Sequence, residues 1–218
     1  MTQRITARPV ATFSIAAIDL DSGDLGVAVQ SKYFAVGAVV PWAAGGIGAI
    51  ATQSWANTDY GPDGLGLLED GLAAGEVIGR LTSADADAQK RQVGVVDSEG
   101  RVANFTGNEC QAWAGATEGD GYTVQGNLLA GPGVIAAMAS AYEARALPLA
   151  ERLLAALQAG QRAGGDRRGQ QSAAVIVVRE NVGAAGFNDR VVDLRVDDSP
   201  TPIDELERLL EMHRRFHA

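Results

Sequence analysis

The chain has 218 residues and a mass of 22.6 kDa, which suits one domain or at most two small ones. Hydrophobic residues make up 46% and charged residues 21%, values typical of a folded globular protein, so a disordered or fibrous chain is excluded. The net charge of -9 and the pI of 4.7 argue against nucleic acid and anionic membranes as partners, because both are bound through clustered Lys and Arg.

Targeting signals and cysteine usage narrow the class of protein further. The sequence has no apolar run of the roughly 18 residues that a membrane span needs, and its N-terminus lacks the pattern of a secretory signal. We therefore expect a cytoplasmic protein. Cys110 is the single cysteine, which excludes an intrachain disulfide and a site built from several thiolates.

Histidine is scarce, and this limits the possible chemistry. His213 and His217 are the only two, four residues apart, and on a helix they would share one face as a metal-binding pair or as a solvated helix end. Because no histidine precedes residue 213, a Ser-His-Asp or Cys-His site is disfavoured. The 27 glycines form no fixed period and indicate many tight turns in an ordered fold.

Short apolar runs predict the strands. Residues 12–18 and 25–31 are separated by the turn formers of residues 19–24, which predicts a β-hairpin. The later runs predict further strands at residues 46–53, 93–97, 102–106, 173–179 and 191–195.

Prolines followed by leucines at spacings of three and four predict the helices. Pro62, Pro132 and Pro148 each stand where a first helical turn would begin. Further helical signals lie near residues 75–82 and after Thr201, where Leu206, Leu209 and Leu210 form an apolar stripe. The resulting order of strands, two helices, strands, two helices, strands and one helix favours two sheets packed face to face, with helices outside.

Several segments in one order carry a family resemblance. They are TFSIA (12–16), GVAVQSK (26–32), GAIATQSWAN (48–57), RQVGVVD (91–97), QGNLLAGP (125–132), GGD (164–166) and FNDR (187–190). Through these segments, which are spread over most of the chain, the sequence resembles an uncharacterised bacterial family grouped with the N-terminal nucleophile (Ntn) hydrolases. The resemblance implies an α+β fold, a four-layer αββα sandwich of two mainly antiparallel sheets, as in proteasome subunits. We expect residues 1–11 to form an N-terminal extension and residues 12–218 a single domain.

In the Ntn superfamily the first residue of the first strand is the nucleophile, and Thr12 holds the matching position. A free α-amine, with a usual pKa of about 7.7 to 8.0, can serve as the base for the hydroxyl of its own residue, which dispenses with histidine. Eleven residues precede Thr12, so activation requires a cut after Ala11. Lys32 follows the second predicted strand and is expected to tune the charge of the amine and the hydroxyl.

The resemblance also implies helper residues. Asp166 and Ser172 stand where proteasome-like chains carry catalytic helpers, with turn capping as the alternative for Asp166. Backbone and amide groups around Gly126 are candidates for holding an oxyanion, or for a simple strand-to-helix turn. The candidate substrate-binding residues are Gln30, Ser31, Gln53, Ser54, Trp55, Asn57, Gln125, Gly126 and Asn127.

These features lead to one favoured function and two alternatives. The favoured function is hydrolysis of a C–N bond in a small amide or peptide substrate, without a cofactor or metal, by a cytoplasmic homodimer. The first alternative is a catalytically silent binding or assembly protein with the same fold. The second keeps hydrolysis but uses an internal hydroxyl such as Ser54 as the nucleophile.

Overall fold

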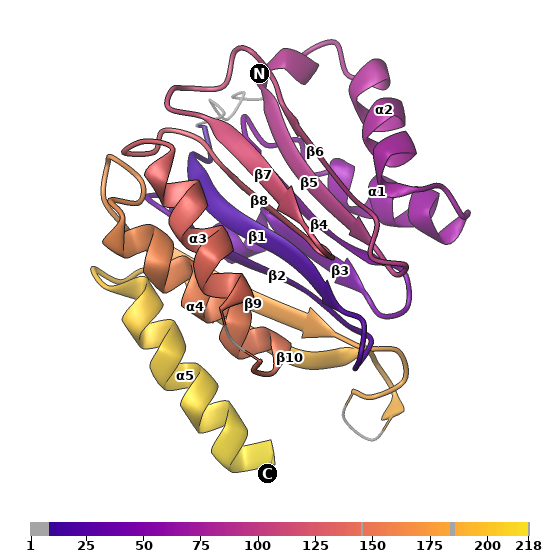
Figure 1. The fold of residues 1–218 in the computed structure, drawn as a ribbon, viewed down its shortest axis with the longest axis vertical. Coiled ribbons are helices and arrows are strands. Elements are labelled where there is room, and N and C mark those ends of the chain that lie inside the picture. Colours follow the sequence, from indigo (N-terminus) through magenta and orange to yellow (C-terminus); the bar gives the residue numbers. More distant parts are fainter. Residues whose placement is uncertain (1–8, 145, 184–185, 218) are drawn as a thin grey trace, which may run out of the picture.

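The computed structural model describes residues 9–144, 146–183 and 186–217, and Figure 1 shows their arrangement. Residues 1–8, most of the predicted N-terminal extension, lie outside this part of the chain, so the division at residue 12 stays a prediction. The described residues form two antiparallel sheets and five α-helices, which confirms a mixed α/β fold.

The larger sheet has six strands in the order β10-β9-β2-β1-β8-β7. Its strands are β1 (Thr12–Asp19), β2 (Asp24–Ser31), β7 (Gly115–Gly119), β8 (Tyr122–Gly126), β9 (Ser172–Val178) and β10 (Arg190–Val196). Strands β1 and β2 form the predicted hairpin, with Thr12 opposite Ser31 and Asp19 opposite Asp24. The Asp19 carboxylate accepts the backbone N–H groups of Asp21 and Ser22, and Gly23 supplies the positive φ that closes the turn.

The smaller sheet has four strands in the order β3-β4-β5-β6. These are β3 (Pro41–Ala44), β4 (Gly48–Ser54), β5 (Arg91–Asp97) and β6 (Val102–Thr106). The sequence predicted β4, β5 and β6 but missed β3, and in the larger sheet it missed β7 and β8.

The five helices are α1 (Tyr60–Glu69), α2 (Ala74–Ala84), α3 (Gly133–Glu143), α4 (Leu149–Arg162) and α5 (Pro202–His217). Helices α3, α4 and α5 pack their apolar residues on one face of the six-stranded sheet, where Phe13, Leu153 and Leu206 belong to one buried cluster. Helices α1 and α2 cover the four-stranded sheet through a second cluster that includes Ile50 and Val77. None of the described helices is long and apolar enough to cross a membrane.

The inner faces of the two sheets meet in a third cluster, formed by alternate residues of the central strands. In β1 the side chains of Phe13 and Ile15 face the helices, whereas Ala16 and Ile18 face the other sheet. Toward the Thr12 end of β1 this interior becomes polar, because Ser14 replaces an apolar residue at the next inward position. The candidate site lies at this end.

Gly94 of β5 allows the sheets to approach where the interior is polar. A Cβ atom at this position would lie 2.2 Å from Gln125 Oε1 and 2.8 Å from Thr123 Cγ2, both on β8. Real Cβ atoms do not approach other atoms this closely, so a side chain here would displace the buried side chains of Gln125 and Thr123 from their hydrogen bonds.

We expect Gly94→Ala to lower the free energy of unfolding by about 1 to 3 kcal/mol, the usual cost of overpacking a core. The control is Gly79→Ala, since Gly79 is exposed on α2 and a Cβ there meets nothing within 4 Å. That change should raise the free energy of unfolding by about 0.5 to 1 kcal/mol through helix propensity. Urea denaturation measures both, and an unchanged stability for Gly94→Ala would contradict the close approach.

Candidate functional site

Five chain segments meet at the edge of the molecule where β1 begins. Thr12 is paired with Ser31 at the end of β2. The carbonyl oxygen of Thr12 accepts the backbone N–H of Asn127, which follows the end of β8. Val10, two residues before Thr12, pairs with Ser54 at the end of β4. The turn before β9 adds Asp166, whose side chain is buried. We call these residues, with Ala11 and Arg168, the Thr12 site.

The carbonyl group of Ala11 has two side-chain donors. The Ser31 hydroxyl lies 2.5 Å from the Ala11 oxygen, and Nη2 of Arg168 lies 2.8 Å from the same atom. This oxygen belongs to the peptide bond between Ala11 and Thr12. One neutral and one charged donor on the same carbonyl oxygen is the arrangement that stabilises negative charge developing there.

Arg168 is held in place by Asp166. The Asp166 carboxylate accepts Nε of Arg168 at 3.0 Å and Nη2 at 2.6 Å, which is a fork-to-fork pair. Because Nη2 carries two hydrogens, one binds Asp166 while the other is left for Ala11. The same carboxylate also accepts the backbone N–H groups of Lys32 and Arg168, at 3.3 and 2.9 Å. Asp166 therefore fixes the direction in which the guanidinium donates.

The hydroxyl group of Thr12 is fully buried and donates to the carbonyl oxygen of Val10 at 2.7 Å. This contact occupies its proton and leaves the lone pairs of Oγ1 available. The carbonyl oxygen of Thr12 accepts the backbone N–H of Asn127, and β1 pairs with β2 on one side and β8 on the other. The backbone at Thr12 is therefore held on both sides. Thr12 is thus a fixed residue next to a carbonyl group that accepts two side-chain donors.

The backbone of Ser54 pairs with Val10, in the segment that leads into β1. The Val10 N–H donates to the Ser54 oxygen at 2.5 Å, and the Ser54 N–H donates to the Val10 oxygen at 3.1 Å. Ser54 has a φ of 69°, a left-handed conformation that is uncommon outside glycine. Its Oγ is buried, and among the described residues it has no hydrogen-bond partner. Burial raises the pKa of the nearby Cys110 thiol, which keeps this group protonated.

A chain of buried amides and hydroxyls continues from the Thr12 site into the space between the sheets. Gln125 Nε2 donates to Ser14 Oγ at 2.7 Å, and Ser14 donates to Gln53 Oε1 at 2.6 Å. Gln53 then donates to Gln92 Oε1 at 2.8 Å, and Asn127 Nδ2 donates to the same oxygen at 2.9 Å. Gln53, expected to bind substrate, thus joins the two sheets through Ser14, and Gln125 holds Ser14 from the neighbouring strand of the same sheet. Substrate binding by either residue stays a prediction.

The donors expected near Gly126 are already engaged. The backbone N–H of Asn127 is bound to Thr12 and its amide nitrogen to Gln92, while the Gly126 oxygen accepts Gln92 Nε2 at 2.9 Å. The donors on the Ala11 carbonyl are Ser31 and Arg168 instead.

Lys32 and Ser172 point elsewhere. The exposed ammonium group of Lys32 donates to the oxygen of Gln170 at 3.3 Å, so only the backbone of Lys32 reaches the Thr12 site. The Ser172 hydroxyl donates to the Tyr33 oxygen and accepts the Val36 N–H, which fastens the turn after β2.

The side chains of the three remaining predicted residues, all within the described ranges, form no hydrogen bond with the Thr12 site. Gln30 alternates with Ser31 along β2, so its side chain faces the helix-covered side of the sheet. Asn57 donates to Asp85 at 3.4 Å, and the Trp55 oxygen accepts Arg91 at 2.6 Å, both on the α1 and α2 side of the molecule.

Sequence reasoning missed Arg168, the one guanidinium bound to Ala11 among the described residues. The available signal was its position two residues after Asp166 in a turn between Gly164 and Gly169, both with positive φ. Such a turn lets a carboxylate bind the backbone and the side chain of the second residue after it.

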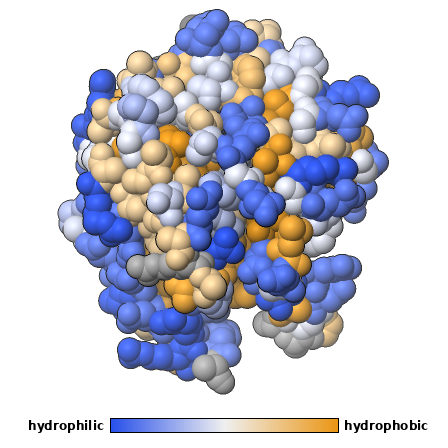
Figure 2. Space-filling view, in the orientation of Figure 1, coloured by the Kyte–Doolittle hydropathy of each residue, from blue (hydrophilic) through white to orange (hydrophobic). Residues whose placement is uncertain are grey.

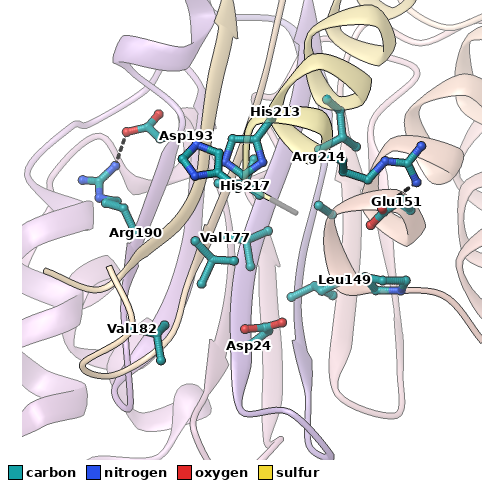
Figure 3. A pocket seen from close by; sticks show the side chains of 15 residues that line it. Asp24, Leu149, Glu151, Val177, Val182, Arg190, Asp193, His213, Arg214 and His217 are labelled. Atoms are coloured by element: carbon teal, nitrogen blue, oxygen red, sulfur yellow. Dashed lines mark hydrogen bonds and ion pairs between the residues drawn. The ribbon is translucent and has the colours of Figure 1, made fainter. Parts of the chain in front are cut away.

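A separate cavity lies under the C-terminal half of α5 (Figure 3). It has a volume of about 760 Å³ and an apolar floor that includes Leu149 and Val177. Figure 2 shows it as a notch at the lower rim of the molecule. It borders Asp24, the start of β2, whereas the Thr12 site adjoins Ser31, the end of the same strand. At about 3.3 Å per residue these ends are about 23 Å apart.

Both histidines line this cavity, with their ring centroids 4.4 Å apart. Burial and the neighbouring His217 lower the pKa of His213, which favours its neutral form. Within the described ranges, no group of three or more His, Cys, Asp or Glu residues has the geometry to hold a metal ion. On the rim Arg190 is paired with Asp193 and Arg214 with Glu151, while Asp24 is paired with Arg179.

Comparison with known proteins places the chain in a family. Residues 12–206 match the family described as "Family of unknown function (DUF1028)", and the chain belongs to this family. The crystal structure of protein SPO2555 from Silicibacter pomeroyi, also assigned to DUF1028, is 34% identical with a TM-score of 0.85, over 93% of this chain and 85% of that chain. No curated protein matches.

A distant structural match is to Anbu (ancestral beta-subunit) from Yersinia bercovieri. It covers 92% of this chain and 94% of Anbu, with 12% identity and a TM-score of 0.38. This similarity is too low to support an argument about fold or activity.

We expect Arg168→Met to lower the free energy of unfolding by about 1.5 to 3 kcal/mol, because it leaves the buried Asp166 carboxylate without its charged donor. The control is Arg190→Met, whose partner Asp193 is about half exposed and whose ion pair should contribute less than about 1 kcal/mol. Urea denaturation of both variants gives the comparison. Equal losses would show that Asp166 does not depend on Arg168.

Proposed function

We propose that this DUF1028 protein is the precursor of an Ntn-type hydrolase with an αββα sandwich fold. The precursor cleaves its own chain between Ala11 and Thr12, and the product hydrolyses a C–N bond in a small amide or peptide. One observation carries the proposal: the Ala11 carbonyl, directly before Thr12, is bound by both the Ser31 hydroxyl and the Arg168 guanidinium. An ordinary strand residue needs no such pair of donors on the preceding carbonyl.

The donors on the Ala11 oxygen support the following self-cleavage step. Oγ1 of Thr12 attacks the Ala11 carbonyl carbon, and the negative charge that develops on the oxygen is stabilised by Ser31 and Arg168. The hydroxyl proton passes to the Thr12 nitrogen as the C–N bond breaks, which leaves Ala11 joined to Oγ1 as an ester. One water molecule then hydrolyses the ester, releasing residues 1–11 as a carboxylic acid and freeing both the amine and the hydroxyl of Thr12.

After cleavage, the free amine of Thr12 takes the proton from Oγ1 when the hydroxyl attacks a substrate carbonyl. An α-amine with a pKa of about 8 suits this task at neutral pH. We assign the charge-tuning role to Arg168, supported by its contact with Ala11 and its fork pair with Asp166, in place of Lys32. The start of the family match at Thr12 also supports a cut at this bond.

A catalytically silent binding protein is the alternative from another class, and it predicts a chain that stays whole. Hydrolysis by Ser54 is the second alternative, favoured by its buried Oγ and its left-handed backbone. A cytoplasmic homodimer remains our prediction, and a monomer mass in light scattering at micromolar concentration would contradict it.

Intact-mass measurement of the purified wild-type chain tests the proposal. We expect a species that begins at Thr12, formed in a first-order reaction whose rate does not depend on protein concentration. Thr12→Val, which keeps the shape but lacks the hydroxyl, should stay full length, whereas Thr12→Ser should still be cut. A wild-type chain that stays whole after prolonged incubation would overturn the mechanism, and cleavage of Thr12→Val would point to a contaminating protease.

Labelling with an electrophilic acylating probe distinguishes Thr12 from Ser54. We expect the labelled peptide of the cleaved protein to begin at Thr12, and Ser54→Ala to retain at least half of the labelling, because the Ser54 backbone makes the contacts with Val10. A label on residues 48–54 that disappears in Ser54→Ala would favour the internal hydroxyl. Peptide mapping by mass spectrometry gives the answer.

A further inference from the structure

We propose that residues 9–11 occupy a peptide-binding cradle, formed by the backbone of Ser54 and the side chains of Ser31 and Arg168. The substrates of the site are then extended peptides with a small residue at the acyl position, and the cradle retains the product through its new C-terminal carboxylate. This substrate class rests on the proposed function, but peptide binding by the cradle does not require catalysis.

The first part of the cradle recognises backbone. Val10 makes both hydrogen bonds of an antiparallel pair with Ser54, which is the pattern by which an extended peptide adds to the end of a strand. These bonds do not depend on the side chain, so any residue with a free N–H can make them. The left-handed conformation of Ser54 turns its N–H and C=O toward the incoming chain instead of along β4. A peptide in place of residues 9–11 would find the same two partners.

The second part selects by size. Ala11 is fully buried, and Val10 is 4% exposed within the apolar cluster between the sheets. A methyl side chain fits at position 11, and a larger one would overpack the edge of the core. The cradle therefore favours alanine or glycine at the acyl position and a β-branched or other medium-sized aliphatic residue before it.

The third part recognises charge. In the intact chain Ser31 and Arg168 share one neutral carbonyl oxygen, but a released peptide presents a carboxylate at this position. Hydrogen bonds from a guanidinium to a carboxylate are roughly twice as strong as neutral ones. The fork pair with Asp166 offsets the charge of Arg168 but leaves one Nη2 hydrogen directed at this oxygen, so Arg168 still supplies a charge-assisted donor there. The cradle should bind a peptide acid more tightly than the corresponding peptide amide.

Binding is tested in a full-length chain that cannot cut itself. Thr12→Val combined with Ala11→Trp removes the hydroxyl and displaces residues 9–11, since the indole cannot fit at the buried position. The probe is acetyl-Pro-Val-Ala with a free carboxylate, and the comparison ligand is its C-terminal amide, both measured by isothermal titration calorimetry. We expect the acid to bind at least tenfold more tightly than the amide. Adding Arg168→Met should abolish this preference.

The parent Thr12→Val chain is the matched control, because its own residues 9–11 still occupy the cradle and should weaken binding of the acid at least tenfold. Equal binding of acid and amide, or no binding of either, would overturn the proposal. If the Ala11→Trp chain fails to fold by circular dichroism, Val10→Asp replaces it, since a carboxylate in the apolar cluster also displaces the segment.

A measurement that needs no displacing variant is hydrogen exchange of the Val10 amide in the Thr12→Val chain. Peptide acid at millimolar concentration should speed this exchange by competing for Ser54, and no change would overturn the cradle. If the wild-type chain stays whole while the acid binds, the proposed function fails and the cradle stands. If the chain is cut but the acid does not bind, the cradle fails alone.

Discussion

The buried hydrogen-bond chain between the sheets is the constraint on which the site depends. Ser14, Gln53, Gln92 and Gln125 are each fully buried, and a buried amide without partners costs several kcal/mol of stability. The bonds that cross between the sheets, from Ser14 to Gln53, from Asn127 to Gln92 and from Gln92 to the Gly126 oxygen, form only when β1 and β8 stand directly over β4 and β5 at one relative position. Packing of aliphatic side chains alone would tolerate a small slide between the sheets, whereas these directional bonds do not. The network therefore determines where the end of β4 lies relative to the beginning of β1.

This fixed position explains why Val10 meets Ser54. The two residues belong to segments that pack on different sheets, and their pairing joins one sheet to the other at its edge. Gly94 contributes by letting Gln125 enter the interior without a clash. On the other side of Thr12, Asp166 orients Arg168 from the turn before β9. The Ala11 carbonyl thus lies between Val10, which Ser54 fixes, and Arg168, which Asp166 fixes. In the proposed mechanism its donors therefore need little reorganisation when charge develops on the oxygen.

Much of the fold was predictable because most elements follow simple periodic patterns. The strands β1, β2, β9 and β10 and all five helices lie where apolar spacing and proline positions indicate. The three missed strands break those rules. In β8, Thr123 and Gln125 point into the polar interior, which removes the apolar alternation. Strand β3 has only four residues, and β7 begins and ends with glycine, so their pairing with longer neighbours determines their structure.

Part of the site was predictable in the same way. Thr12, Ser31, Ser54, Asn127 and Asp166 follow or precede strands, and strand order brings such ends together. The role of Arg168 was not predictable, because an arginine in a glycine-rich polar turn looks like a solvated charge in the sequence. Only the tertiary structure shows that the Asp166 carboxylate turns its guanidinium toward Ala11. Lys32 illustrates the opposite case, since its position suits a catalytic role while its ammonium group binds Gln170 at the surface.

In the proposed mechanism, the burial of Thr12 links self-cleavage to any later activity. While residues 9–11 are in place, the Thr12 hydroxyl is covered and the Ser54 backbone is already paired, so no second peptide can reach the same groups. Under that mechanism, cutting the bond alone would not open the site, because the donors on the Ala11 oxygen would also hold the new carboxylate. Strong donors would speed the cut and slow the departure of the product. The fork pair with Asp166 moderates this conflict, since it offsets the charge of Arg168 without occupying the hydrogen that points to Ala11. An arginine without this partner would hold the carboxylate more firmly, and one without the contact to Ala11 would not assist the cut.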